Sequence, residues 1–341
     1  MFLISPRALI PSLVILIMPA MILAADGVAL TVTGTTQLGR DFEGKEVPWW
    51  SGGALLALDG TRFTSQPYVR AFDRNGDAMF SAPFQLADGS VHSVYRLARG
   101  SDGIVALAGS AFFNDGARSL GHFIAWIAPD GKEQHVFRTS FVPDEMTVAS
   151  DGAIWAQAWD GLREKDRNRG IIRRFDRSGK LLGAFVPKSS LTKYLKVGDD
   201  IVPSHLVASR DRIGWYSINN REYIEFSLDG SEIRRYPAAD LKDLRFTGAG
   251  LCDDGGLFIS AEERESKERP WQVFALDRPS KTWKSVVINE GLRSRNWGMI
   301  FGCEGSALVT KTAGSGSGEL TWYTPTVSDA SAAAVSVPAP R

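Results

Sequence analysis

The chain has 341 residues, of which 39 are Lys or Arg and 39 are Asp or Glu, so its formal net charge is zero. A balanced charge gives no general attraction to nucleic acid or to an anionic membrane surface. The composition therefore excludes a protein that binds either partner through net charge.

The amino-terminal segment has the order of a secretory signal peptide. An apolar run covers Ala8–Leu23, and the small residues Ala24 and Ala25 follow it. The alternative is an uncleaved membrane anchor, because the run approaches the ~20 residues that a spanning helix needs. Pro11 and Pro19 interrupt the run, which favours a cleaved signal peptide over residues 1–25. We therefore expect a periplasmic or secreted protein that has no membrane contact after cleavage.

Two families of turns recur along the rest of the chain. Asp-x-x-Gly or Asp-Gly turns, at intervals of 55, 48 and 51 residues, have the glycines Gly76, Gly131, Gly179 and Gly230. Such turns join tight hairpins because glycine supplies the positive φ that they require. A second turn precedes each of these, with small, apolar strands on both sides. Two hairpins in each unit make four strands, and such repeats are typical of propeller blades.

Counting the units predicts the closure of the ring. Five units are complete, and a sixth, Asn296–Pro325, ends after its third strand. The strand predicted over Gly27–Leu38 can supply the missing edge, which leaves no exposed edge to aggregate. We predict an all-β, six-bladed β-propeller over residues 26–327, with the amino-terminal strand closing the last blade. A pair of β-sandwiches fits a ~50-residue period poorly.

Two segments depart from this strand pattern. Residues 328–341 are small, contain proline and are poor in large apolar side chains, which predicts a disordered tail. The best helix candidate, Ser189–Lys196, is only one or two turns long.

One blade resembles a known superfamily. The stretch Pro143–Gly161, followed by Gly170–Phe185, is similar to a blade of the NHL and gluconolactonase-like (regucalcin-type) six-bladed propellers. The likeness is clear over this blade and weaker over the other five. It implies fold more than activity.

The resemblance also implies an alternative function, a metal-dependent lactonase or hydrolase. Such lactonases hold a divalent cation at the channel mouth through an acidic residue of the first blade, an asparagine and an aspartate. Glu43 or Glu46 could be that acidic residue, but Thr247 and Gly248 occupy the place of the Asn-Gly pair. Calcium prefers several oxygen ligands, and it is implied only under this alternative. No other cofactor and no catalytic motif is evident.

Polar residues near the beginnings of the inner strands predict a binding site at the channel mouth. His205 stands at nearly the same distance from its turn as Glu145 does in the preceding unit. Blade equivalence places six residues around one end of the channel: Arg96, Asp144, Glu145, His205, Arg245 and Asn296. Because unpaired buried charge costs several kcal/mol, this ring must be wet, mutually paired or occupied by a ligand. The other interpretation is a set of solvated strand ends.

Long connections between the second and third strands indicate a second binding surface. These connections span residues 113–121, 159–170, 262–270 and 312–318, and long loops carry binding more often than scaffolding. We predict an exported, monomeric binding module that contacts a protein, peptide or carbohydrate through this long-loop face and the channel mouth.

The two cysteines predict a disulfide. Cys252 and Cys303 each stand at the end of an inner strand, just before the turn, in neighbouring units. Exported proteins reach an oxidising compartment, where such a pair can bridge adjacent blades. Two buried free thiols are the alternative.

Overall fold

The computed structural model describes most of the predicted propeller. It covers residues 28–37, 49–59, 68–88, 91–113, 118–159, 168–191, 204–217, 221–238, 241, 244–263, 271–288, 298–312 and 319–327. The predicted signal peptide (1–25) and tail (328–341), and Glu43, Glu46 and Asn296, lie outside the described residues, so the expectations for them stay predictions.

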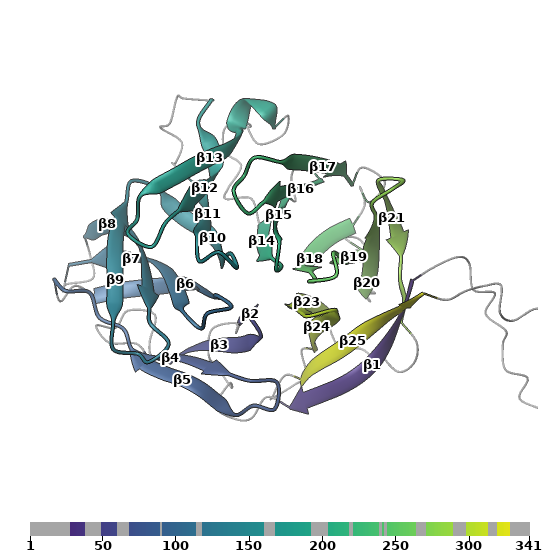
Figure 1. The fold of residues 1–341 in the computed structure, drawn as a ribbon, viewed down its shortest axis with the longest axis horizontal. Coiled ribbons are helices and arrows are strands. Elements are labelled where there is room, and N and C mark those ends of the chain that lie inside the picture. The colour runs from purple at the N-terminus through teal and green to yellow at the C-terminus, as the bar shows by residue number, and fades with distance from the viewer. Residues whose placement is uncertain are drawn as a thin grey trace, which may run out of the picture. The chain divides into compact units, whose positions relative to one another are not determined.

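Five sheets of four antiparallel strands, each built from consecutive strands, form the first five blades (Figure 1). The first contains β2 (Trp49–Ser51), β3 (Ala54–Asp59), β4 (Tyr68–Phe72) and β5 (Ala78–Pro83), and the second β6 (Val91–Arg99), β7 (Val105–Phe112), β8 (Ser119–Ile127) and β9 (Gln134–Thr139). The third contains β10 (Val142–Val148), β11 (Ile154–Trp159), β12 (Gly170–Phe175) and β13 (Leu181–Pro187), and the fourth β14 (Ser204–Ala208), β15 (Arg212–Ser217), β16 (Glu222–Ser227) and β17 (Ile233–Pro237). The fifth contains β18 (Leu244–Leu251), β19 (Leu257–Glu263), β20 (Trp271–Asp277) and β21 (Thr282–Ser285).

The sixth blade is assembled from distant parts of the chain. Its sheet has the order β22-β1-β25-β24-β23. Its strands are β1 (Val28–Gln37), β22 (Val287–Ile288), β23 (Gly298–Glu304), β24 (Ala307–Thr312) and β25 (Glu319–Val327). β1 runs antiparallel to β25, from Val28 opposite Val327 to Gln37 opposite Glu319. The six-bladed propeller closed by its amino-terminal strand is therefore confirmed.

One strand of this blade was not predicted. β22 pairs with β1 in parallel, with Ala29 opposite Val287 and Leu30 opposite Ile288. It comes from the connection that follows the fifth blade. A two-residue strand has no alternation of its own to reveal it in the sequence, so only its partner defines it.

The outer hairpin turns follow the chemistry expected from the repeats. Gly179 has a φ of +86°, a conformation that costs a side-chain-bearing residue free energy but suits glycine. The carboxylate of Asp176 accepts hydrogen bonds from the backbone N–H groups of Ser178, at 2.9 Å, and Lys180, at 2.9 Å. The side chain thereby holds the turn that reverses β12 into β13.

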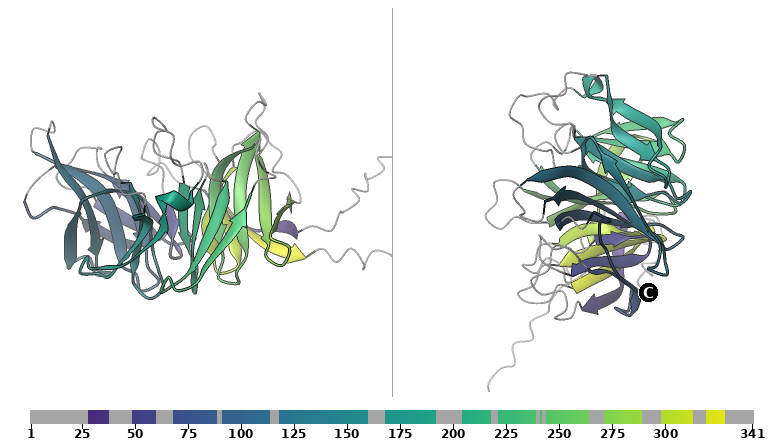
Figure 2. Two further views of the ribbon diagram at one scale, coloured as in Figure 1. Left: turned by 90° about the horizontal axis from the view of Figure 1, so that it is seen from above. Right: turned by 90° about the vertical axis from the view of Figure 1, so that its left-hand side faces the viewer.

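The core lies between the blades rather than within them. Trp155 of the third blade is fully buried, and its ring lies 5.5 Å from that of Phe226 in the fourth. Trp50 of the first blade packs edge to face on Trp322 of the sixth, at 5.4 Å. Seen from two further sides, the sheets stand next to one another around the ring (Figure 2). Each blade therefore buries both faces only when its neighbours are present.

The helix predicted over Ser189–Lys196 is met at two residues, Ser189 and Ser190. Lys188–Ser190 forms one turn of 3-10 helix, and residues 192–200 lie outside the described part. Across the described residues, no helix has the length and apolar character to cross a membrane.

Candidate functional site

A cavity of about 1050 Å³ runs along the centre of the propeller. Its wall includes residues of β2, β6, β10, β14, β18 and β23. Each of these strands is the last in its sheet and has a neighbour on one side only. Each inner edge therefore carries backbone N–H and C=O groups without a partner in the sheet, and such groups need water, side chains or a ligand.

An ion pair between two blades lies in the inner part of this wall. Arg96 of β6 places Nη2 2.9 Å and Nε 3.1 Å from the same carboxylate oxygen, Oε1 of Glu145 in β10. The Nη1 of Arg96 donates to the carbonyl of Tyr95, at 2.8 Å. Burial raises the pKa of Glu145, and the charge of Arg96 and hydrogen bonds from Arg96 and the Leu206 backbone oppose that rise. The pair ties the second blade to the third inside the channel.

Asp144 stands beside this pair at an irregularity of β10. The register with β11 shifts between Pro143 and Glu145, so Asp144 is the extra residue of a β-bulge. Burial raises its pKa to about 6, Arg96 lowers it, and Glu145 raises it further. Asp144 is not among the residues that line the cavity, so at this position the wall itself holds the carboxyl group of Glu145 beside the guanidinium of Arg96.

His205 of β14 lines the cavity in the neighbouring blade. Burial lowers the pKa of its imidazole to about 4, and the nearby positive charge of Arg96 acts in the same direction. The ring is consequently neutral at pH 7 and can both donate and accept a hydrogen bond. We call Arg96, Asp144, Glu145 and His205 the inner cluster.

Behind the inner cluster, a buried hydrogen-bond network holds β14 in place. Gln157 of β11 is fully buried, and its Oε1 accepts from the Nε1 of Trp215 at 2.6 Å and from the hydroxyl of Ser204. Gln157 lies opposite Glu145 in the sheet, and Ser204 is the residue before His205. The network therefore fixes the spacing between the two blades that carry the carboxylate and the imidazole.

The cavity continues past the inner cluster through an apolar belt to a polar rim. The belt includes Leu97, Met146, Val148, Leu206, Leu251 and Ile300. The rim lies at the turns between the first and second strands and carries Arg99, Arg210, Asp253 and Glu304 among its charged residues. The described wall thus reaches the face with the tight turns. The binding site expected at a channel mouth around the inner cluster stays a prediction.

Contacts between neighbouring turns hold this rim together. Ser150 donates to the Arg210 carbonyl at 2.5 Å, and the N–H of Arg210 donates to the carboxylate of Asp253 at 2.8 Å. The N–H of Asp253 in turn donates to the carbonyl of Gly305, at 2.8 Å. These hydrogen bonds connect the third, fourth, fifth and sixth blades in sequence.

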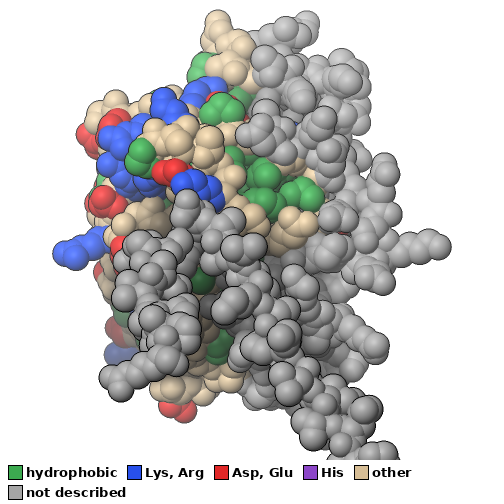
Figure 3. Space-filling view, turned by 90° about the vertical axis from the view of Figure 1, so that its right-hand side faces the viewer, with side chains coloured by type: hydrophobic (Ala, Val, Ile, Leu, Met, Phe, Trp, Pro, Cys, Tyr) green, Lys and Arg blue, Asp and Glu red, His purple; other side chains and the backbone are tan. Residues whose placement is uncertain are grey.

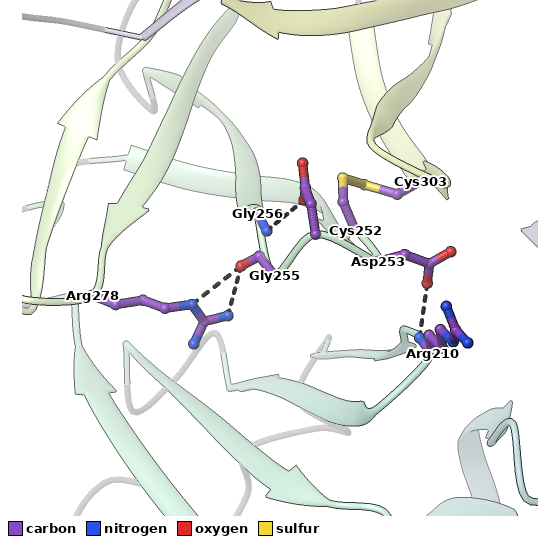
Figure 4. The surroundings of a disulfide bond; sticks show 8 residues. Arg210, Cys252, Asp253, Gly255, Gly256, Arg278 and Cys303 are labelled. Atoms are coloured by element: carbon purple, nitrogen blue, oxygen red, sulfur yellow. Dashed lines mark hydrogen bonds between the residues drawn. A yellow bond between two sulfur atoms is a disulfide. The ribbon is translucent and has the colours of Figure 1, made fainter. Parts of the chain in front are cut away.

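The structure joins Cys252 and Cys303 in a disulfide beside this rim (Figure 4). The Cα atoms lie 5.0 Å apart, within the usual range for a disulfide. A Cβ added to Gly248 in the fifth blade would lie 2.2 Å from the carbonyl oxygen of Ile300 in the sixth. The backbones of the two blades therefore approach each other closely. Cys303 also contributes to the cavity wall.

The remaining predicted site residues are not brought into this cluster by the described structure. Arg245 lies in β18 opposite Glu262, and its side chain is outside the description, as is all of Asn296. The weak metal candidates Glu43 and Glu46 are also outside. Among the residues that the structure describes, no group of three His, Cys, Asp or Glu side chains could hold a metal ion.

The position where the lactonases have an Asn-Gly pair has a structural use here. The hydroxyl of Thr247 donates to that of Ser260 at 2.9 Å, and Ser260 also accepts from the N–H of Ile300 at 3.1 Å. Thr247 thus supports the contact between the fifth and sixth blades. The lactonase alternative stays a prediction, to be tested by titration with divalent metal and measurement of lactone hydrolysis.

The outer surface is charged but locally balanced. Figure 3 shows Lys and Arg side chains gathered on one part of this face, with Asp and Glu among them. Arg234 pairs with Glu232 at 2.5 Å, Arg235 with Glu222 at 3.1 Å, and Lys284 with Asp277 at 2.8 Å. These pairs leave no reason to assign an anion-binding role to the outer strands β17 and β21.

The long connections stand where the repeats predicted them, between second and third strands. They join β7 to β8, β11 to β12, β19 to β20 and β24 to β25. Residues 114–117, 160–167, 264–270 and 313–318 within them lie outside the described part. A long-loop binding surface therefore stays a prediction.

Sequence reasoning missed the rim residues and Gln157. Arg99 ends β6 and Arg210 stands in a turn, at reversals that read as ordinary and solvated, and only the ring brings the two residues to one opening. Gln157 looked like part of a buried strand, but one polar residue within the apolar run "AIWAQAW" was a usable signal, because a buried amide needs hydrogen-bond partners.

Comparison with known proteins adds little to this description. No family model matches the chain, and no curated protein matches it. A protein of unknown function from Bacteroides caccae is 13% identical over 81% of this chain and 96% of its own, with a TM-score of 0.44. A luciferin-regenerating enzyme is 12% identical over 85% of this chain and 95% of its own, with a TM-score of 0.47. Similarity at this level does not extend to activity or ligand.

Proposed function

We propose that the protein is an exported binding protein that holds a small organic molecule in its central channel. The observation that carries this proposal is the cavity of about 1050 Å³, to which all six inner strands contribute. Binding sites for small molecules are typically cavities of ~300–1,000 Å³, mostly apolar, with a few placed polar groups. Here the apolar belt supplies the apolar wall, and the inner cluster supplies the polar groups.

The proposal changes the expected ligand. A protein, peptide or carbohydrate at the long-loop face was the expectation from the loops. The described cavity favours a smaller ligand, because it is enclosed by inner strands and reaches the face with tight turns. Contact of the long loops with a macromolecular partner stays compatible with this function.

Export and superfamily are parts of the same proposal. The apolar segment Ala8–Leu23 and the disulfide between Cys252 and Cys303 support an oxidising, extracytoplasmic location. The sequence pattern of the third blade supports a place among the NHL and gluconolactonase-like propellers. The propeller fold is compatible with that superfamily and with many others.

A variant that fills the channel tests the function. Val207 of β14 is half-buried and lines the cavity, so Val207→Trp should obstruct the channel. Leu181→Trp is the control, because Leu181 lies on the outer strand β13 with 51% of its surface exposed. The wild-type protein would be screened against a metabolite library by thermal shift, and the ligands found would be measured by calorimetry. We expect V207W to weaken their binding at least tenfold and L181W to leave it unchanged.

The melting temperature of each variant without ligand shows whether the fold is intact. Ligands that bind wild type and a folded V207W equally would place binding outside the channel and contradict the proposal. A screen without any ligand that stabilises wild type would contradict it as well.

A further inference from the structure

We propose that the channel selects an uncharged ligand, a mainly apolar molecule whose terminal hydroxyl group binds to His205. This inference rests on the proposed function, because it names the ligand class of the same channel. It is carried by the balanced charge of the cavity wall, by an imidazole that has no hydrogen-bond partner among the described residues, and by the apolar belt beside it.

The first step is the charge of the cavity wall. Among the described lining residues, the charged ones are three arginines and three carboxyl residues: Arg96, Arg99, Arg210, Glu145, Asp253 and Glu304. The described wall therefore has no net charge. The ionised group of a ligand would leave water and meet no net opposite charge, which costs free energy. An uncharged molecule avoids that cost.

The second step is the protonation state of His205. Burial lowers the pKa of its imidazole to about 4, and the positive charge of Arg96 acts in the same direction. The ring therefore stays neutral at pH 7 and supplies no positive charge that could attract an anion. A neutral imidazole has one donor and one acceptor nitrogen, and a hydroxyl group can also both donate and accept. The two groups are complementary.

The third step is which polar groups of the inner wall can meet a ligand. Arg96 donates to Glu145 at 3.1 Å and to the carbonyl of Tyr95 at 2.8 Å. Glu145 also accepts from the backbone of Leu206. The side chain of His205 makes no hydrogen bond to another residue within the described ranges. Of Arg96, Glu145 and His205, the last is therefore the residue that can bind the hydroxyl group of a ligand.

The fourth step is the apolar wall that follows His205 on its own strand. Leu206, Val207 and Ala208 come next in β14, and all three line the cavity. At ~3.3 Å per residue, this part of the strand extends roughly 10 Å beyond His205. An octyl chain has a comparable length. A molecule of that size would leave its hydroxyl group at His205 and its alkyl chain along the belt.

Two other ligand classes fit this wall less well. A sugar would place hydroxyl groups against Leu206, Leu251 and Ile300, where they would lose their hydrogen bonds to water. A metal ion would need several ligands converging on one point. In the described part of the chain, no three His, Cys, Asp or Glu side chains converge in that way.

A matched series of three compounds tests the preference for an uncharged ligand: 1-octanol, octylamine and octanoate. They share the alkyl chain and differ in the charge of one end. We expect calorimetry at pH 7.5 to show 1-octanol binding at least tenfold tighter than either ion. Lowering the pH to 5 should strengthen octanoate binding at least fivefold, because its carboxyl group takes up a proton and becomes neutral. The affinity for 1-octanol, which does not titrate, measures the effect of the protein's own groups over the same interval, Asp144 and Glu145 among them.

Three variants locate the hydroxyl group. His205→Phe removes both ring nitrogens, keeps an aromatic ring and should weaken 1-octanol binding about fivefold, the effect of one lost hydrogen bond. His205→Gln keeps a donor and an acceptor and should bind 1-octanol more tightly than H205F does. His135→Phe is the matched control, because His135 lies on the outer strand β9 and is not among the lining residues. We expect H135F to change the affinity less than twofold, and the melting temperature of each variant shows whether it is folded.

The outcomes separate this inference from the proposed function. If octylamine or octanoate binds as tightly as 1-octanol at pH 7.5 and V207W weakens them all, the channel binds ligands and the preference for uncharged ones is wrong. If V207W weakens 1-octanol binding and H205F does not, His205 does not bind the hydroxyl group. If 1-octanol binds equally to wild type, V207W and H205F, it does not occupy the channel and the inference fails. Absence of 1-octanol binding to wild type also contradicts it.

Discussion

The third and sixth blades reach the same sheet by opposite routes. The third is one continuous segment from Val142 to Pro187, in which each strand lies next to the one before it, with tight turns after β10 and β12 and a long connection between β11 and β12. The sixth takes strands from residues 28–37, 287–288 and 298–327. Local turns thus fix one blade, whereas the other depends on a pairing between the two ends of the propeller.

The closing blade compensates with contacts that the third blade does not need. The disulfide binds it to the fifth blade. On its other side the guanidinium of Arg74, in a turn of the first blade, lies 4.8 Å from the Trp322 ring centre, and Thr36 of β1 donates to the Arg74 carbonyl at 2.6 Å. Pairing strands that are distant in the sequence costs more chain entropy than closing a hairpin. We therefore expect stabilising contacts on both sides of the sixth blade.

Removing β1 should have the largest effect on stability. Deletion of residues 28–37 would leave β25 without its outer partner and remove Leu30, which is 1% exposed, from the core. We expect the cooperative thermal transition, followed by circular dichroism, to be lost. A synthetic peptide of residues 28–37 added in excess should restore it. A deletion variant that melts like wild type would show that the pairing of β1 with β25 is not needed for stability.

Breaking the disulfide should have the next largest effect. The bond spans a sequence separation of 51 residues, and chain-entropy models give a stabilisation of about 4 kcal/mol for such a loop. The double variant Cys252→Ser/Cys303→Ser should unfold at a lower denaturant concentration than wild type. Reductant should shift wild type in the same direction and leave the variant unchanged. Mass spectrometry without reduction should find no free thiol in the mature protein, and two free thiols would contradict the disulfide.

Acid should have the smallest net effect on stability, and it should act through titratable groups of the third and fourth blades. The folded state lowers the pKa of His205 from 6.5 to about 4, so its contribution is present above pH 6.5 and lost as the pH falls towards 4. It raises the pKa of Asp144 from 3.8 to about 6, so that contribution is present at low pH and lost as the pH rises through 6. Burial raises the pKa of Glu145 in the same direction as that of Asp144. The contributions oppose each other, and wild type should change little in this window.

Asp144→Asn uncovers the effect of His205. Between pH 7 and pH 4.5 we expect the free energy of unfolding of D144N to fall by about 2 kcal/mol more than that of wild type. His205→Asn should shift in the opposite direction. Urea unfolding at the two pH values measures both, and equal pH dependence in all three proteins would show that these groups do not oppose each other.

The same two blades show how far the sequence could predict the structure. The strands of the third blade follow from alternation and from Gly152 and Gly179, whose positive φ values mark the reversals. The closure of the sixth blade followed from counting, because its segment had one strand too few and β1 was left over. β22 could not be predicted, since two residues carry no periodicity.

The candidate site was predictable in its membership more than in its geometry. Glu145 and His205 were paired by their equal distances from their turns, which a repeat preserves. Their depth in the channel, and the rim formed by Arg99 and Arg210, depend on how the inner strands of different blades face one another. That arrangement comes from packing between sheets, which one repeat read alone does not contain.

The pairing of β1 with β25 also sets an order of events for the newly made chain. Among the described strands, β1 is synthesised first and its partner β25 is synthesised last. At ~5–20 residues per second, the interval is on the order of tens of seconds. During that time the early blades can form hairpins, but the ring has two open ends. The ring can therefore close only after essentially all of the propeller has been made.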